Sequence, residues 1–180
     1  MNDISKLFCT LCGNQSLAKL KPQNDTHVRI VCKSCNNIIY ENPKIIVGSV
    51  CSFENKILLC KRAIDPQKGL WTLPAGYLEV NESAEEGAIR EAYEEAYANI
   101  KIINLLAVYS LKHISQIQMI FESELIDKNI KPGIESLDVG LFSWSDIPWE
   151  KLAFESVKWS LNNFKQRQNS NTFKVFNNPN

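Results

Sequence analysis

Residues 76–98 read GYLEVNESAEEGAIREAYEEAYA, and the rest of the chain is organised around this stretch. Ser83 is followed three residues later by Glu86, which is the pattern of a helix capping box. The alanine, glutamate and arginine residues that follow favour a helix, and no proline interrupts them. We therefore predict a helix over residues 84–97.

This predicted helix carries three glutamates on one arc. At 100° per residue, Glu91, Glu94 and Glu95 fall together, and we expect the opposite arc to pack on a core. The opposite arc contains Ile89, Ala92 and Ala96. A solvated acidic surface is the simplest interpretation of such an arc. Gly87 on the acidic side favours a binding site instead, because a glycine inside a helix costs about 1 kcal/mol relative to alanine. Close approach of a ligand to the helix would explain why a glycine stands at position 87.

Three carboxylates within one helical turn repel one another unless cations neutralise them. Hard oxygen ligands of this kind suit Mg²⁺ or Mn²⁺, which usually keep several waters and bridge to substrate phosphates. The acidic arc is therefore a candidate site for one of these two cations.

The composition limits the domain organisation and the class of partner. The chain has 180 residues, 44% of them hydrophobic, with 20 basic and 20 acidic side chains. It can bury one good core and a small second module. The balanced charge argues against a nucleic-acid partner. The sequence has neither an apolar run of membrane-spanning length nor a signal-peptide pattern, so we expect a soluble, cytoplasmic protein with no membrane partner.

Four of the six cysteines predict a zinc site in the first module. Cys9, Cys12, Cys32 and Cys35 form two C-x2-C pairs, and two such turns can present four thiolates to tetrahedral Zn²⁺. Disulfides or free thiols are the alternatives. Four protein ligands leave no open position, so we interpret the zinc as structural and place a zinc ribbon at residues 1–41. His27 is expected in a surface loop rather than as a fifth ligand.

The other segments read mainly as strands. We predict strands at residues 44–53 and 57–62, which bury Cys51 and Cys60, and further strands at residues 100–111, 116–125 and 141–144. A second helix is predicted at residues 156–166. The asparagine-rich residues 169–180 are expected to form a loose tail.

Residues 76–98 resemble the Nudix box, G-x5-E-x7-R-E-U-x-E-E-x-G-U. The matching positions are Gly76, Glu82, Arg90, Glu91, Glu94 and Glu95. One position departs, because Tyr97 stands where the box has a glycine. We expect the helix to continue past Tyr97 and to end at Asn99, which tolerates the left-handed conformation better.

The resemblance extends to zinc-ribbon Nudix hydrolases, which include plant FAD pyrophosphatases, and more loosely to ADP-ribose pyrophosphatases. It is carried by residues 40–44, 59–62, 71–79 and 132–137. It implies a Nudix-type α/β/α sandwich with a mixed sheet over residues 42–168, preceded by the zinc ribbon. It also implies a cation-dependent hydrolysis of a diphosphate in a small nucleotide substrate.

The resemblance further implies roles for the residues of the box. Glu91 and Glu95 would bind the catalytic Mg²⁺ or Mn²⁺, Glu94 would assist directly or through water, and the carbonyl of Ala75 would complete the inner shell. Arg90 paired with Glu82 would hold the preceding loop on the helix so that Glu91 points inward.

Residues outside the box are candidates for substrate contacts. Arg62 is a candidate for gripping phosphate, with a surface lysine–arginine pair as the alternative. Glu135 follows a Pro-Gly break, where the family often supplies a further acid, and is a candidate general base. Trp71, Tyr77 and Phe154 could stack on a ring of the substrate, although a place in the core explains each of them equally well.

Three functions compete at this stage. We favour the hydrolysis of FAD to FMN and AMP, and hydrolysis of ADP-ribose or another nucleoside diphosphate derivative is the alternative within the same chemistry. An NADH pyrophosphatase would carry an SQPWPFP-like segment after the box, which this sequence lacks. A zinc-ribbon binding module on a Nudix scaffold is the non-enzymatic alternative. We leave open whether the chain forms a homodimer.

Overall fold

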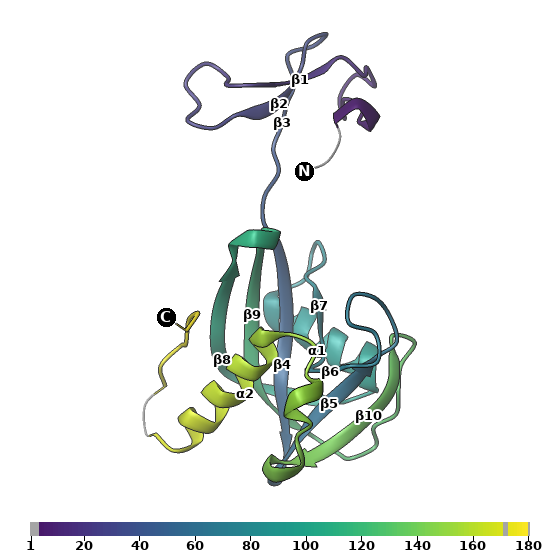
Figure 1. The fold of residues 1–180 in the computed structure, drawn as a ribbon, viewed down its shortest axis with the longest axis vertical. Coiled ribbons are helices and arrows are strands. Elements are labelled where there is room, and N and C mark those ends of the chain that lie inside the picture. Colours follow the sequence, from purple (N-terminus) through teal and green to yellow (C-terminus); the bar gives the residue numbers. More distant parts are fainter. Residues whose placement is uncertain (1–3, 171–172, 180) are drawn as a thin grey trace. The chain divides into compact units, whose positions relative to one another are not determined.

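The computed structural model describes residues 4–170 and 173–179 of the chain (Figure 1). The chain divides into two compact units, Met1–Asn42 and Pro43–Asn180. In the first unit, the strands β1 (Leu17–Leu20), β2 (Arg29–Cys32) and β3 (Ile38–Ile39) form an antiparallel sheet in that order. A short 3-10 helix, η1 (Ile4–Lys6), precedes it.

The second unit is built on a mixed sheet. Its strands are β4 (Lys44–Phe53), β5 (Lys56–Arg62), β6 (Trp71–Thr72), β7 (Ala75–Tyr77), β8 (Ile100–Leu111), β9 (Gln116–Leu125) and β10 (Ser136–Ser143). The sheet order is β10-β5-β4-β9-β8, with β6 beside β5 and β7 beside β4. The pair β4 and β9 is parallel and the other pairs are antiparallel. The mixed sheet that the sequence predicts is confirmed.

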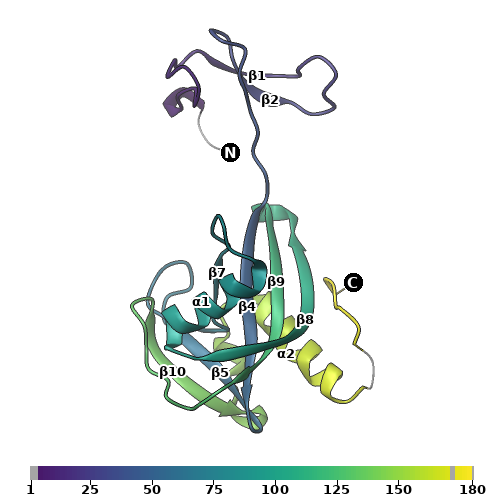
Figure 2. The ribbon, with the colours of Figure 1, turned by 180° about the vertical axis from the view of Figure 1, so that it is seen from behind.

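Two helices lie on opposite faces of this sheet (Figures 1 and 2). On one face, α2 (Glu155–Gln168) packs Val157, Leu161 and Phe164 into a core that includes Tyr109 and Ile120. On the other face, α1 (Ala84–Ala96) packs alanines into two smaller core clusters. The α/β/α sandwich is therefore confirmed. The 3-10 helices η2 (Lys112–Ile114), η3 (Trp144–Asp146) and η4 (Trp149–Lys151) form the remaining turns. No helix among the described residues is long and apolar enough to cross a membrane.

The predicted strands agree closely with the structure. The three long strands β4, β8 and β9 have the predicted bounds, and Cys51 and Cys60 are buried. The last strand, β10, begins earlier than predicted, at Ser136 rather than at residue 141. Its first half, Ser136 to Val139, alternates polar and apolar residues over only four positions, and backbone pairing with β5 defines it as a strand.

The predicted end of α1 is wrong. The capping box of Ser83 and Glu86 is present, but α1 ends at Ala96, and Tyr97 adopts the left-handed conformation with φ of 50°. The ring of Tyr97 packs edge-on against Tyr93 with a centroid separation of 5.4 Å, and the Lys131 ammonium lies 4.0 Å from its centroid. An aromatic pair and a cation–π contact each contribute about 0.5–1 kcal/mol. Together they offset the cost of about 1–2 kcal/mol for a left-handed non-glycine residue, so the helix does not continue to Asn99.

The described part of the C-terminal tail, residues 173–179, is not loose as predicted. The backbone of Phe176 donates to Leu106 O and accepts from Val108 N, both at 2.9 Å. The side chain of Asn178 bonds both backbone groups of Ser110. Since β8 is an edge strand, its free backbone groups provide these partners, and composition alone does not reveal them.

Candidate active site and zinc site

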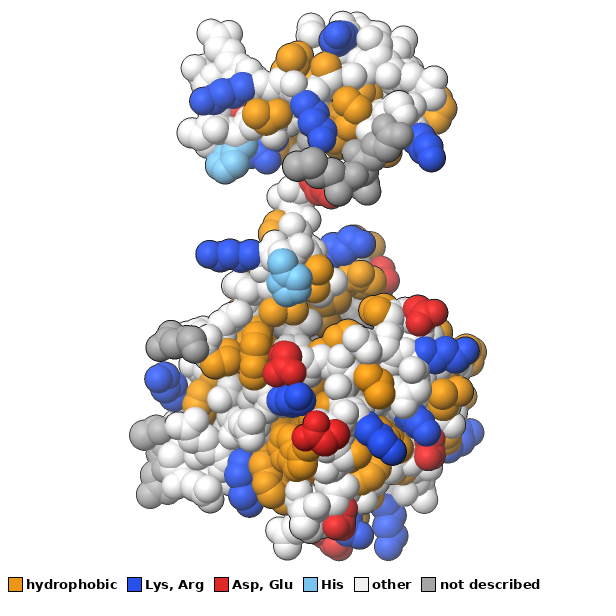
Figure 3. Space-filling model, viewed as in Figure 1, with side chains coloured by type: hydrophobic (Ala, Val, Ile, Leu, Met, Phe, Trp, Pro, Cys, Tyr) orange, Lys and Arg blue, Asp and Glu red, His pale blue; other side chains and the backbone are white. Residues whose placement is uncertain are grey.

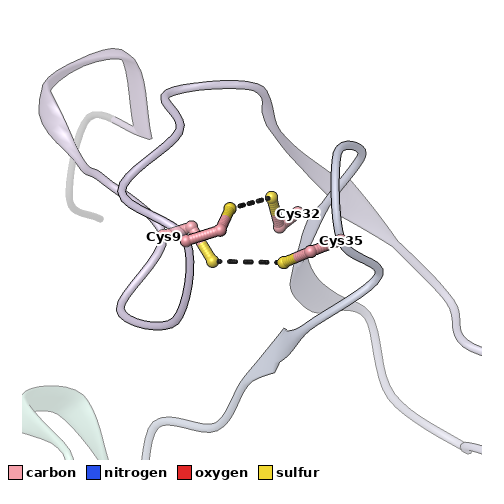
Figure 4. A group of neighbouring side chains, drawn as sticks. Cys9, Cys32 and Cys35 are labelled. Carbon is pink, nitrogen blue, oxygen red and sulfur yellow. Dashed lines mark hydrogen bonds between the residues drawn. The ribbon is translucent and has the colours of Figure 1, made fainter.

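The sulfur atoms of the four cysteines of the first unit all lie within 4.8 Å of one another, which is close enough to hold one metal ion. Figure 4 labels three of these residues, Cys9, Cys32 and Cys35. The Sγ–Sγ distances are 3.6 Å for Cys9 and Cys35 and 3.7 Å for Cys12 and Cys32. Four thiolates around a tetrahedral zinc, each at about 2.3 Å, would stand about 3.8 Å apart. The donor set and its geometry therefore fit Zn²⁺.

The two C-x2-C turns have the same backbone hydrogen bonds. Cys9 O accepts from Gly13 N at 2.9 Å, and Cys32 O accepts from Asn36 N at 2.8 Å. Both donor residues, Gly13 and Asn36, have left-handed backbones. Backbone N–H groups of Cys12 and Leu11 hydrogen-bond the Cys9 sulfur and lower its thiol pKa to about 6. This arrangement favours the thiolate form that a metal requires.

In the second unit, Arg90 joins the approach loop to α1, as predicted. Its Nε and Nη2 donate to the two carboxylate oxygens of Glu82 at 3.0 and 2.7 Å. Nη2 also donates to Tyr77 O at 2.9 Å. The bidentate ion pair with Arg90 is the main cause that lowers the pKa of Glu82 to about 2. Glu82 thus remains ionised and holds the loop against the helix.

Two glycines make room for the carboxylates of this region. A Cβ on Gly76 would lie 2.4 Å from the carboxylate of Glu91, so only glycine permits this approach. A Cβ on Gly87 would lie 2.8 Å from a Glu82 oxygen and 2.9 Å from Val47. The close approach at Gly87 is therefore made by the chain itself, and the ligand contact that we inferred for this glycine is wrong.

The acidic arc of α1 is partly buried. Glu91 and Glu95 are buried beside Ala88 and Ala92, whereas Ile89, expected in the core, is exposed. The side chain of Glu94 is 58% exposed. Arg90 Nη1 bridges Glu91 at 2.7 Å and Glu94 at 3.1 Å. The acidic and apolar faces are thus not opposite, because a cavity beside the core admits the two inner carboxylates.

Burial makes the charged forms of the inner carboxylates costly. Desolvation, followed by repulsion from Glu91, raises the pKa of Glu95 to about 8, and Arg62 and the backbone of Ala75 oppose this shift. Desolvation also raises the pKa of Glu91. A divalent cation would supply the missing positive charge. Chemically, the donor set fits Mg²⁺ or Mn²⁺, with Glu91, Glu95, Glu94 and the Ala75 carbonyl as the groups that would hold it.

These residues line one end of a cavity of about 1250 Å³. Arg62, Ala75, Tyr77 and Glu135 all line it, as do Phe154 and the box glutamates Glu91, Glu94 and Glu95. The guanidinium carbon of Arg62 lies 5.2 Å from the Phe154 ring centroid, and its Nε donates to Pro66 O at 2.8 Å. The structure thus brings Arg62 to the acidic cluster.

Trp71 is the predicted substrate contact that the cavity does not include. Its ring packs edge-on against Phe142, with centroids 4.9 Å apart, beside the core under α2. Pairing of β6 with β5 and the hydrogen bond from Ala153 N to Trp71 O hold it there. The structure therefore supports the interpretation of Trp71 as a core residue and does not bring its side chain to the cavity.

Sequence reasoning missed several residues that line the cavity. They are Tyr93, Tyr97, Gln118 and Trp159. Gln118 follows Gln116 on one face of β9, and these two polar positions on a strand that is otherwise apolar up to Phe121 are the signal that could have indicated it. The aromatic residues carry no such signal, because aromatic side chains are usual in a core.

A model of the NUDIX domain matches residues 42–160, which is more than half of the chain. The chain belongs to the Nudix hydrolase family. A model of the Nudix N-terminal zinc ribbon matches residues 7–41. Together the two Nudix models account for both units and support the assignment of the cysteine cluster to zinc.

Similar proteins are Nudix hydrolases of several kinds. ADP-ribose pyrophosphatase from Methanocaldococcus jannaschii is 34% identical over 126 residues, which are 67% of this chain and 72% of the relative. NAD-capped RNA hydrolase from Photobacterium profundum is 30% identical over 148 residues, which are 81% of this chain and 50% of the relative. The chain therefore spans about half the length of that hydrolase.

A solved structure has the same fold over nearly the whole length. It is the crystal structure of a Nudix hydrolase from Nitrosomonas europaea, with 45% sequence identity and a TM-score of 0.88. The similarity covers 95% of this chain and 98% of that one.

Proposed function

We propose that this Nudix hydrolase cleaves the diphosphate of a substrate in which ADP is linked to a second group. The observation that carries the proposal is a cavity of about 1250 Å³ whose lining includes both the buried carboxylates of α1 and several aromatic side chains. Pockets for small ligands usually measure about 300–1000 Å³, so this cavity has room for a dinucleotide-sized molecule.

The names of the relatives favour ADP-ribose as the first substrate to test. One relative is an ADP-ribose pyrophosphatase, and another acts on NAD-capped RNA. ADP-ribose and NAD share an ADP half. FAD, which we favoured from the sequence, contains the same half and stays a prediction. Free NAD and NADH join the panel because the relatives support NAD-like substrates more directly than they support FAD.

The reaction needs charge on the diphosphate neutralised and a water aligned with one phosphorus. A bound Mg²⁺ or Mn²⁺ would supply most of this neutralisation and lower the pKa of a bound water. Glu91 and Glu95 would bind the cation, with Glu94 as an outer ligand. Arg62, whose charge acts on Glu95, would bind a phosphate oxygen beside the cation. Arg90 acts through Glu82 and Glu91, whose positions it holds.

Glu135 is the proposed general base. Its carboxylate raises the pKa values of Glu91 and Glu95 by repulsion, so it faces the same space as they do. It belongs to a loop that is fixed on the C-terminus of α1 by hydrogen bonds from Lys131 N to Ala96 O at 3.0 Å and from Gly133 N to Glu95 O at 2.9 Å. This attachment gives an otherwise exposed loop carboxylate a defined position.

A turnover panel tests the proposal. The purified protein is incubated with ADP-ribose, NAD⁺, NADH, FAD and UDP-glucose, with Mg²⁺ and with Mn²⁺, and the products are separated by chromatography. We expect AMP from the ADP-containing substrates and a much slower reaction with UDP-glucose. Glu91→Gln serves as the inactive control. Lack of hydrolysis throughout the panel would favour the non-enzymatic binding module.

An NAD-capped RNA oligonucleotide is added to the panel as a separate arm. The chain carries equal numbers of acidic and basic side chains, so we expect cleavage of the cap to gain nothing from the attached RNA. A rate on capped RNA well above that on free NAD⁺, lost at high salt, would contradict the expectation of no nucleic-acid partner. Light scattering of the same preparation would test the homodimer.

A further inference from the structure

The apolar face of the sheet that α2 covers ends at a glutamine of β9. Ile120 of β9 lies in the core with Tyr109 and Leu161. Gln118 is two residues away on the same strand, so its side chain lies on the same face. It pairs in register with Ile46 on one side and with Tyr109 on the other. It thus stands where the core under α2 ends and the cavity begins. Figure 3 shows acidic, basic and hydrophobic side chains interspersed on one face of the second unit.

The side-chain amide of Gln118 has no hydrogen-bond partner within residues 4–170 and 173–179, although the residue is half-buried. Its neighbour Tyr109 differs, because the Tyr109 hydroxyl accepts from Asn163 Nδ2 at 2.8 Å. A half-buried amide without a protein partner is available to a ligand that enters the cavity.

The sheet register sets the position of this amide relative to the acidic cluster. Ala75 pairs with Gly48, and Tyr77 pairs with Ile46. The row formed by Tyr77, Ile46 and Gln118 therefore lies two residues, about 6.6 Å, from the row that contains Ala75. That step matches the ribose between the phosphates and the base of a nucleotide. A diphosphate held beside Ala75 would place its base over this row.

Two aromatic side chains flank the row. Tyr77 is nearly half exposed, and Lys44 Nζ lies 4.9 Å from its ring centroid. Trp159 of α2 packs edge-on against Tyr109 with a centroid separation of 5.4 Å. Tyr77 and Gln118 belong to strands two apart in the sheet, about 9.6 Å across, which leaves room for a planar ring between the aromatic walls. Both aromatic residues line the cavity with Gln118.

We propose that Gln118 is a specificity-determining residue whose side-chain amide hydrogen-bonds the adenine of the substrate. A carboxamide presents one donor and one acceptor side by side, and adenine presents the complementary pair, an amino group next to a ring nitrogen. This inference rests on the proposed function, because that function supplies the adenine nucleotide. Gln118 does not touch the reacting atoms and acts by holding the base.

The test replaces the amide in two ways. Gln118→Leu keeps the approximate size and removes both hydrogen bonds. Gln118→Glu keeps the shape but offers acceptors only, which suit the adjacent N–H donors of guanine. The matched control is Gln166→Leu, the same change at an exposed position of α2 outside the cavity. Thermal melts verify that each variant is folded.

The measured quantities are kcat/KM for ADP-ribose and GDP-mannose and, independently of turnover, the Kd values of AMP and GMP by calorimetry. We expect Gln118→Leu to lower kcat/KM for ADP-ribose about tenfold to a hundredfold, mainly through KM, and to weaken AMP binding by a similar factor. Gln118→Glu should shift the preference from AMP toward GMP. The control should stay within about twofold.

The outcomes separate the inference from the proposed function. If the wild type hydrolyses ADP-ribose and Gln118→Leu leaves both kcat/KM and the AMP Kd unchanged, the inference is wrong and the function stands. If the wild type hydrolyses nothing in the panel but binds AMP through Gln118, the function fails and the inference stands. Failure of the wild type to bind AMP at millimolar concentration would overturn the inference directly.

Discussion

The backbone N–H of Gly133 donates a 2.9 Å hydrogen bond to the carbonyl oxygen of Glu95, near the C-terminal end of α1. The Cα of Gly133 also lies close to the backbone of Glu94. A Cβ on Gly133 would lie 1.7 Å from the carbonyl oxygen of Glu94. The loop that carries Glu135 thus packs directly on the backbone of the two C-terminal box glutamates. This contact couples the proposed base to the proposed cation ligands.

Gly133→Ala should therefore displace the loop from α1. Gly133 is not among the residues with a left-handed backbone, so the effect comes from steric collision rather than from φ. We expect a loss of about 1–3 kcal/mol in the free energy of unfolding and a fall in kcat. Chemical denaturation and turnover measure the two effects. Lys128→Ala, at an exposed position of the same loop region, is the control, and equal behaviour of the two variants would refute the coupling.

Glu91→Gln and Glu95→Gln should each lower kcat by about a hundredfold or more, because each removes charge that stabilises the transition state through the cation. The melting temperature of either variant should not fall, because a neutral amide relieves the repulsion among the inner carboxylates. Steady-state kinetics with saturating Mg²⁺ checks the first point. Glu85→Gln, at an exposed position in the first turn of α1, should keep the wild-type rate. Near wild-type turnover in both inner variants would exclude them as ligands.

The stability of the cation-free protein should depend on the protonation of Glu95. Its pKa in the folded state is about 8, against an ordinary value of 4.5. Because the folded-state pKa is raised, this contribution to stability is full below about pH 4.5 and is lost as the pH rises to about 8.

Glu95→Gln lacks this dependence. The variant should melt at the wild-type temperature near pH 4.5 and above it at pH 8, in buffer free of Mg²⁺ and Mn²⁺ but without chelator, so that zinc is retained. Added Mg²⁺ should reduce the difference at pH 8. A difference that is independent of pH would show that Glu95 does not titrate in this range.

Cys9→Ser and Cys32→Ser should lose the zinc and unfold the first unit while the second unit stays folded. About 40 residues bury too little apolar surface to fold without the metal, whereas the second unit has its own core. Elemental analysis should find one zinc per wild-type chain, and limited proteolysis should cleave the first unit of each variant. Cys51→Ser, at a buried position away from the cluster, should keep its zinc. Protease resistance of the first unit without zinc would contradict this prediction.

Tyr97→Gly should be more stable than Tyr97→Ala by about 1 kcal/mol. Both variants lose the contacts with Tyr93 and Lys131, but only glycine is free of the left-handed penalty. Inside a helix the order would be reversed, with alanine more stable by about 0.5–1 kcal/mol. The sign of the difference in denaturant melts therefore reports the backbone conformation at residue 97. Asn99→Gly should change nothing at the helix end.

Much of the candidate site could be predicted because its signals are spacings along the chain. The capping box at Ser83, the pairing of Arg90 with Glu82 and the gathering of Arg62 and Glu135 at the acidic cluster all agree with the structure. Trp71 could not be assigned in this way. A tryptophan suits a core and a ring-binding wall equally well, and its packing on Phe142 depends on strand pairing.

The sequence by itself determined the two cysteine turns, the three long strands and the acidic helix, because local hydrogen bonds and residue periodicity specify each of them. The tertiary structure decided where α1 ends, which glutamates are buried and where residues 173–179 lie. Tyr97 is held by Lys131, and Phe176 is held by the edge of β8. Contacts between residues distant along the chain, each contributing about 1 kcal/mol, outweigh local propensities of the same size.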